Sequence, residues 1–374
     1  MNFFSLNLLF QLHLMIKKTA ILTFFLLPIF FNSCIQEEEL DTNADILEAY
    51  IPPQYLKTDP IITNNSIEFR VKSNIDLKNQ APVFILSPNA TIDPVNGTLR
   101  DYSTTQTAVV TAQDKRWKKV YTISFNIDEL KTSYLFDQAE LTDKDRYYRF
   151  YSIGSNGDKI YDWATGNSGY VTVAGNKTPD EYPTTVEKGR NGGYAAKMQT
   201  LYTSSFAAAT GNPIAAGNLF LGSFKTNIFN TLKSTKFGLP YSGELPKSVR
   251  TYYKYKAGKE MRDQDFKVIP GAVDSFDIYA IIFESQAKDN YLYGDHDFKD
   301  PRNVAIARVS KADRLETSNW REINFPFKLV EGKKYDPTKE YVLAIVMSSS
   351  IDGAYFTGAI GSTLIVNEVE LIYN

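Results

Sequence analysis

The stretch Thr363-Leu364-Ile365-Val366-Asn367-Glu368-Val369-Glu370-Leu371, near the carboxyl end, indicates the fold class of this chain. Apolar and polar side chains alternate along it, as they do in a half-buried β-strand. Under strict alternation, Leu364 and Val366 would share one face with Glu368 and Glu370. A bulge near Asn367 relieves this conflict, because one extra residue reverses the faces that follow it. We therefore expect a final strand that carries acidic side chains, with a continuous apolar face only if a bulge lies near Asn367.

Other short strands precede this one from about residue 131 onward, where Gly, Asn, Tyr and Phe become frequent. The loops between them are long, and no long helical periodicity is present. Roughly eight to ten strands in a region of this length predict a jelly-roll β-sandwich over residues 131–374. The expected strands are Tyr147–Ile153, Gly169–Val173, Ala195–Leu201, Leu219–Phe224, Ser248–Tyr255, Phe276–Glu284, Val304–Val309, Trp320–Phe327, Tyr341–Ser348 and Ser362–Leu371.

Residues 57–130 form a second, smaller region of short strands. Ser66–Val71 and Lys119–Phe125 alternate apolar with polar residues, and Asn96-Gly97 is a tight-turn signal. Strands at this spacing predict a small antiparallel sandwich, so the whole chain is expected to be all-β. The remaining strands expected here are 82–86, 90–97 and 107–112.

The amino terminus predicts a lipoprotein signal over residues 1–34. An apolar run, Ala20–Phe31, follows Lys17 and Lys18 and ends just before Cys34, the chain's one cysteine. A transmembrane helix is the alternative, but the run is too short, since spanning takes roughly 20 residues. Met15 is the better start, and acylated Cys34 would be the anchor. Residues 35–56 are then a polar, acidic tether.

Composition excludes several classes of function. The net charge of −2 argues against a nucleic-acid partner. The chain has two histidines, and His13 lies in the signal, so His296 alone would have to serve a His-based triad. Zinc sites with two or three histidines are excluded. The acidic pairs at 263–265 and 295–297 fit solvated loops better than catalysis. We therefore expect no enzyme activity.

The smaller region resembles the immunoglobulin-like amino-terminal modules of surface lipoproteins from glycan-foraging Gram-negative bacteria. Glu37-Glu38-Glu39 after the cysteine also resembles the signal that directs these proteins to the outer face of the outer membrane. The resemblance implies a spacer module and a lipid-anchored, surface-exposed protein. The residues that carry it are Leu86–Pro94, Gly97-Thr98, Asp101–Ser103, Val109–Asp114 and Lys119–Ile123.

The larger region resembles the putative carbohydrate metabolism domain (PCMD) of outer-membrane lipoproteins, in order and over nearly its whole length. The family implies a carbohydrate role and little about mechanism. The motifs that carry the resemblance are Trp163–Tyr170, Gly192–Met198, Ala216–Gly222, Phe237–Tyr241, Tyr252–Lys256, Asp277–Ala280, Ser348–Ser350, Gly358–Leu364 and Asn367–Leu371.

Sugar rings stack on aromatic planes, so exposed aromatics are the candidate binding residues. Trp163 leads, because it lies in a Gly/Asn loop, although a core or sheet-edge position is the alternative. Tyr170, Tyr194, Tyr253 and Tyr255 are secondary candidates.

Calcium is the one cofactor that the sequence suggests, in a structural role. Jelly-roll sugar-binding modules often hold one between the first and last strands, where Asp137 or Glu140 and Glu368 would be ligands. Surface acids without a metal are the alternative that we prefer.

Together these features predict an outer-membrane lipoprotein that binds a polysaccharide or oligosaccharide without cleaving it. Other outer-membrane glycan-uptake proteins are candidate partners. A glycan hydrolase on the same fold is one alternative, and it predicts two carboxylates converging in a cleft. A structural or adhesive surface component is the other, and it predicts neither an aromatic platform nor a groove.

Overall fold

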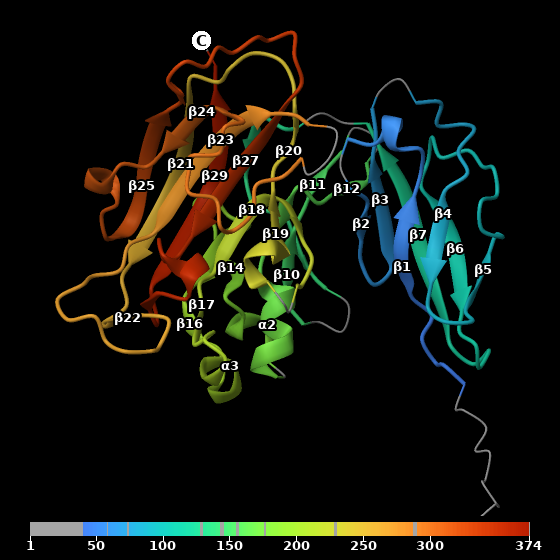
Figure 1. Ribbon diagram of the computed structural model, residues 1–374, viewed down its shortest axis with the longest axis horizontal. Coiled ribbons are helices and arrows are strands. Elements are labelled where there is room, and N and C mark those ends of the chain that lie inside the picture. The colour runs from blue at the N-terminus through green and yellow to red at the C-terminus, as the bar shows by residue number, and fades with distance from the viewer. Residues whose placement is uncertain are drawn as a thin grey trace, which may run out of the picture. The chain divides into compact units, whose positions relative to one another are not determined.

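The computed structural model describes residues 40–57, 59–72, 75–127, 130–142, 146–154, 157–175, 177–227, 230–286 and 290–373. The predicted signal, with Met15 and Cys34, lies outside the described residues. The chain divides into two compact units, Met1–Thr42 and Asn43–Asn374, and every element below belongs to the second. The described residues are mainly strands, as predicted, with short helices (Figure 1).

The amino-terminal module, residues 44–126, has an apolar core of its own. Ile67, Phe69 and Tyr121 are fully buried or nearly so, because alternate side chains of a strand point to the same face. The strands pair in the order β2-β3-β7-β6-β5, with a separate β1–β4 pair. Their bounds are β1 (Ile46–Tyr50), β2 (Ile61–Ile62), β3 (Ser66–Arg70), β4 (Val83–Leu86), β5 (Thr91–Asp93), β6 (Gln106–Thr111) and β7 (Lys118–Asn126).

Two predictions for this module were wrong. β3 and β7 pair in parallel, with Ser66 opposite Thr122, so the module is not purely antiparallel. The predicted tether, 35–56, also ends too late, because β1 pairs with β4 and buries Ile46 and Ala49 in the core. The polar composition of this segment does not indicate a strand, because β1 is defined by its pairing with β4.

The carboxyl-terminal module is a sandwich of two sheets. Within the described residues, the larger sheet follows the order β13-β18-β27-β23-β24-β26, with β19 and β20 beside it. Its strands are β13 (Trp163–Ala164), β18 (Asn218–Phe224), β19 (Thr235–Phe237), β20 (Leu239–Tyr241), β23 (Asp277–Glu284), β24 (Asn303–Arg308), β26 (Lys328–Leu329) and β27 (Tyr341–Ser348).

The smaller sheet follows the order β14-β15-β29-β21-β25, and β8 pairs with β29. Figure 1 shows β25, β21 and β29 side by side. Its strands are β8 (Ser133–Tyr134), β14 (Thr184–Lys188), β15 (Tyr194–Gln199), β21 (Ser248–Lys256), β25 (Thr317–Pro326) and β29 (Thr363–Ile372).

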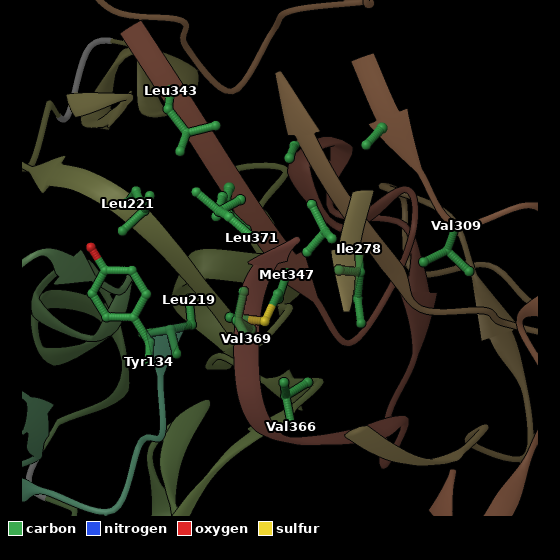
Figure 2. Packing of buried hydrophobic residues seen from close by; sticks show 14 of the residues in the cluster. Tyr134, Leu219, Leu221, Ile278, Val309, Leu343, Met347, Val366, Val369 and Leu371 are labelled. Atoms are coloured by element: carbon green, nitrogen blue, oxygen red, sulfur yellow. The ribbon is translucent and has the colours of Figure 1, made fainter. Parts of the chain in front are cut away.

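The main core fills the space between these two sheets. Figure 2 shows Leu219 and Met347 of the larger sheet packed toward Val369 and Leu371 of the smaller one. Because both inner faces are apolar, burial of this layer is the main source of stability in the module. The all-β sandwich prediction is confirmed.

The last strand contains the bulge near Asn367 that the sequence left open. Thr251 of β21 lies opposite Val369, but Tyr252 lies opposite Asn367, so Glu368 is skipped in the pairing. Glu368 has a φ of 60°, the left-handed backbone conformation found in such irregularities. As a result Leu364, Val366, Val369 and Leu371 all face the core.

The strand expected at Gly169–Val173 is wrong, since these residues lie in helix α2 (Asn167–Ala174). The side chain of Asn167 bonds both backbone groups of Thr184, at 2.6 and 3.0 Å. These buried tertiary bonds hold the first turn and override the strand propensity of Val171 and Val173.

The remaining elements are short and lie in the connections. The paired strands are β9 (Ala139–Leu141) with β10 (Tyr148–Phe150), β11 (Ser152–Ile153) with β12 (Lys159–Ile160), β16 (Leu201–Tyr202) with β17 (Ile214–Ala215), and β22 (Met261–Arg262) with β28 (Gly358–Ala359). The helices are α3 (Ser205–Ala209) and the 3-10 turns Pro53–Tyr55, Pro179–Glu181, Thr231–Ser234, Lys311–Asp313 and Gly353–Tyr355.

Candidate functional site

A cleft of about 1050 Å³ lies between the amino-terminal module and the β9–β13 region with α2 and β18. This volume is at the upper end of the range for ligand sites in proteins, roughly 300–1,000 Å³. The lining mixes aromatic, apolar and charged side chains. It includes Asp45–Tyr50, Leu56, Asp59–Asn65, Tyr121, Glu140–Thr142, Arg146, Tyr147, Arg149, Phe150, Tyr161, Trp163–Thr165, Ser168, Val171, Gly222–Lys225 and Lys236.

A buried ion cluster joins the two modules beside the cleft. Arg70 of β3 pairs with Asp162, and its Nε lies 3.2 Å from a carboxylate oxygen of Glu68. Tyr134 donates a hydrogen bond to the other oxygen of Asp162 at 2.8 Å. The Arg70 and Asp162 side chains are 8% and 5% exposed, so the opposite charges compensate each other away from water. Burial, and then the Asp162 charge, raises the pKa of Tyr134 well above its ordinary value.

Glu140, Arg149 and Tyr161 form a connected group in the carboxyl-terminal wall of the cleft. The Arg149 guanidinium lies 4.0 Å from the Tyr161 ring centroid and 3.2 Å from Glu140. Lys159 and the Tyr161 hydroxyl also donate hydrogen bonds to Glu140. Burial alone would raise the pKa of Glu140, but the three donors outweigh it and lower that pKa. The group therefore presents a fixed aromatic ring beside an ionised, fully bonded carboxylate.

The other carboxylates that line the cleft also have donor partners. Asp45 pairs with Lys119, and Asp59 pairs with Lys236 at 2.7 Å. Glu48 accepts a hydrogen bond from the hydroxyl of Tyr50. A glycosidase acid needs a carboxyl group whose pKa is raised. Glu140 does not fit that role, because its pKa is lowered.

One carboxyl group with a raised pKa lies elsewhere. Burial raises the pKa of Asp274, which accepts hydrogen bonds from Ser350, Ser362 and the backbone N–H of Ala359 at 2.6–2.7 Å. Because these donors fix the loop before β29, Asp274 has a structural role.

Four of the five predicted stacking residues lie in the interior. Trp163 is 6% exposed and packs edge-on against Tyr134 and Phe136, with ring centroids 5.2 and 5.0 Å away. Tyr170, Tyr253 and Tyr255 are buried as well. These residues present no free ring face to a sugar, because their rings complete the core. This corrects the prediction and supports the core alternative for Trp163, which reaches the cleft only as part of its floor.

Tyr194 is the exception among the predicted rings. It is 39% exposed at the start of β15, with the Tyr148 ring 6.2 Å away. It does not line the cleft.

Two of the predicted calcium ligands have cationic partners. Glu140 is bonded to Lys159, Arg149 and Tyr161, whereas Glu368 pairs with Arg190 at 3.0 Å on the smaller sheet. Asp137 is exposed next to Gly193. In the described part of the chain, no three His, Cys, Asp or Glu side chains are grouped as a metal site would need.

Two aromatic residues that sequence reasoning missed lie on the outer face of the smaller sheet. Arg190 lies 3.7 Å from the Tyr252 ring centroid, and Lys254 lies 4.6 Å from that of Trp320. The carboxylates nearby are paired, Glu368 with Arg190 and Glu370 with Arg250. Because neither Tyr252 nor Trp320 lines the cleft, this face is a weaker candidate than the cleft.

The residues of the cleft that the sequence did not reveal are Tyr161, Arg149 and Tyr50. Tyr161 directly precedes the Asp162-Trp163 pair, but no local pattern shows that it lines a cleft. No described helix has the length and apolar character needed to cross a membrane.

Comparison with known protein families gives a matching family model for each module. The model of the family described as "Putative carbohydrate metabolism domain" matches residues 135–372, and the model "SGBP, N-terminal" matches residues 47–124. None of the curated proteins compared with this chain matches it.

Two solved structures are similar. One, described as a putative glycoside hydrolase from Bacteroides thetaiotaomicron, has 42% identity and a TM-score of 0.82, covering 91% of this chain and 99% of its own. The other, described as a putative glycoside hydrolase from Bacteroides vulgatus, has 32% identity and a TM-score of 0.58, covering 65% and 98%. These matches connect the chain with surface proteins that handle glycans.

Proposed function

The chain belongs to the family of the putative carbohydrate metabolism domain, and we propose that it binds a glycan in the cleft without cleaving it. The observation that carries this proposal is the composition of the cleft wall. A sugar offers flat C–H faces and many hydroxyl groups. The Tyr161 ring, backed by Arg149, offers a flat partner, and the surrounding side chains offer donors and acceptors.

The state of the carboxylates supports binding over hydrolysis. Hydrolysis needs one carboxyl group that holds a proton near neutral pH and a second that is an ionised base or nucleophile. Glu140 has three donors and a lowered pKa, so it stays ionised. The similar structures described as putative glycoside hydrolases make product formation the property to test beside binding.

We place this glycan-binding protein on the outer membrane, held by acyl chains on Cys34. The match of residues 47–124 to "SGBP, N-terminal" supports a surface location. Capture of a polysaccharide there would deliver it to other glycan-uptake proteins.

A binding screen of the soluble form, residues 36–374, tests the proposal. Laminarin, pectic galactan and yeast mannan are titrated by calorimetry, and each mixture is then analysed for released sugars. We expect binding to at least one polymer, no product, and roughly tenfold weaker binding for Tyr161→Ala, about 1.4 kcal/mol.

Tyr161→Phe, which keeps the ring, is expected to retain most of the affinity. Phe206→Ala is the matched control, because Phe206 is 78% exposed and lies outside the cleft. If sugars were released, the hydrolase alternative would replace the binding proposal. If Tyr161→Ala bound the polymer as tightly as the wild type, the cleft would be excluded as the binding site.

A further inference from the structure

We infer that the amino-terminal module forms one wall of the glycan site, so that the ligand is a sugar chain and not a single sugar. This inference rests on the proposed function of the cleft. It gives the module a direct role in binding, whereas the family resemblance implied a spacer.

Both modules contribute side chains to the same cavity. All five residues of β1 and the segment 59–65 line it from one side, and Tyr161, Arg149 and Tyr147 line it from the other. A monosaccharide fills only a small part of about 1050 Å³ and would contact one wall at a time. A chain of several sugars can contact both walls, so affinity should depend on chain length.

The wall formed by β1 has side chains available for a ligand. Tyr50 and Leu47 are 47% and 52% exposed, while Ile46 and Ala49 on the same strand are buried in the module core. The hydroxyl of Tyr50 donates to Glu48. An exposed ring in this wall, with Tyr161 in the other wall, is an arrangement suited to a sugar chain that contacts both.

The wall is also held in place at separate points. The backbone N–H of Asp59 donates to the Tyr291 hydroxyl at 3.0 Å, and the Asp59 carboxylate pairs with Lys236 at 2.7 Å. The buried Arg70–Asp162 pair forms a further connection. Because the site is assembled before the ligand arrives, binding does not have to order the two modules, which favours affinity.

The test compares Tyr50→Ala with Trp117→Ala in the soluble form, residues 36–374. Trp117 is the matched control, because it is an aromatic residue of the same module, is 62% exposed and lies outside the cleft. Each variant is titrated with laminarin, pectic galactan and yeast mannan. Glucose, galactose and mannose are then added as competitors.

We expect Tyr50→Ala to weaken binding of the polymer roughly tenfold, while Trp117→Ala binds like the wild type. Each monosaccharide should displace the polymer at least a hundredfold less well than a short oligosaccharide of the same sugar. Wild-type affinity in Tyr50→Ala, or equal competition by the monosaccharide, would overturn the inference.

The same experiment separates this inference from the proposed function. If Tyr161→Ala loses affinity and Tyr50→Ala does not, the cleft binds glycan through the carboxyl-terminal module alone. If the wild type binds none of the three polymers, both the proposed function and this inference fail.

Discussion

Replacing Asp162 with Asn should strongly destabilise the connection between the two modules. Asp162 compensates the buried charge of Arg70. Among the described residues, Glu68 is the only other anion within 4 Å of the Arg70 guanidinium, and it stays in place in the variant. Breaking a buried ion pair by removing one partner costs about 3–5 kcal/mol. Because Glu68 retains part of the compensation, we expect a loss near the lower end, about 3 kcal/mol.

Urea unfolding followed by tryptophan fluorescence measures this loss, and Trp163 is a suitable probe because it adjoins Asp162 in sequence and is buried. The matched control is Asp297→Asn, which breaks a pair with Lys299 at 3.5 Å between side chains that are 60% and 84% exposed. A surface pair of this kind contributes about 0–1 kcal/mol. If Asp162→Asn cost no more than Asp297→Asn, the buried cluster would not hold the modules together.

Three further predictions concern stability. Asp274→Ala should lower the free energy of unfolding by about 2–4 kcal/mol in urea titrations, since it removes the acceptor of the buried donors of Ser362 and Ala359. A loss below 1 kcal/mol would contradict this. Burial lowers the pKa of His296 from 6.5 to about 4, so its stabilising contribution is full above pH 6.5 and is lost as the pH falls toward 4. His296→Gln should therefore flatten the dependence of unfolding free energy on pH in that window, and an unchanged slope would count against it. EDTA should leave the melting temperature unchanged, because Glu140 and Glu368 have cationic partners; a decrease reversed by calcium would disprove this.

The sequence predicted those features of the fold that depend on local periodicity. The final strand is an example, because its apolar and polar residues alternate and the pairing with β21 shows an irregularity near Asn367, where that alternation was in question. Most strands of the sandwich were found in the same way. The segment Gly169–Val173 was missed because the bonds between Asn167 and Thr184 determine its conformation, and no local pattern encodes them.

The site residues were harder to predict, because exposure depends on packing between distant segments. An aromatic residue in a Gly/Asn loop is compatible with a surface platform or with a core position. Trp163 is in the core because Tyr134 and Phe136 cover its ring. Tyr50 was placed in the tether by composition, yet the β1–β4 pairing makes it part of a folded wall.

Three consecutive residues connect the core, the module contact and the cleft. Tyr161 faces the cleft, Asp162 pairs with Arg70, and Trp163 packs in the main core on β13. The backbone of this segment is fixed against β18, since Trp163 lies opposite Leu221 and the carbonyl of Asp162 accepts from Gly222. A displacement of Trp163 would therefore move Asp162 and Tyr161 with it. The geometry of the cleft is therefore set by the packing of the sandwich.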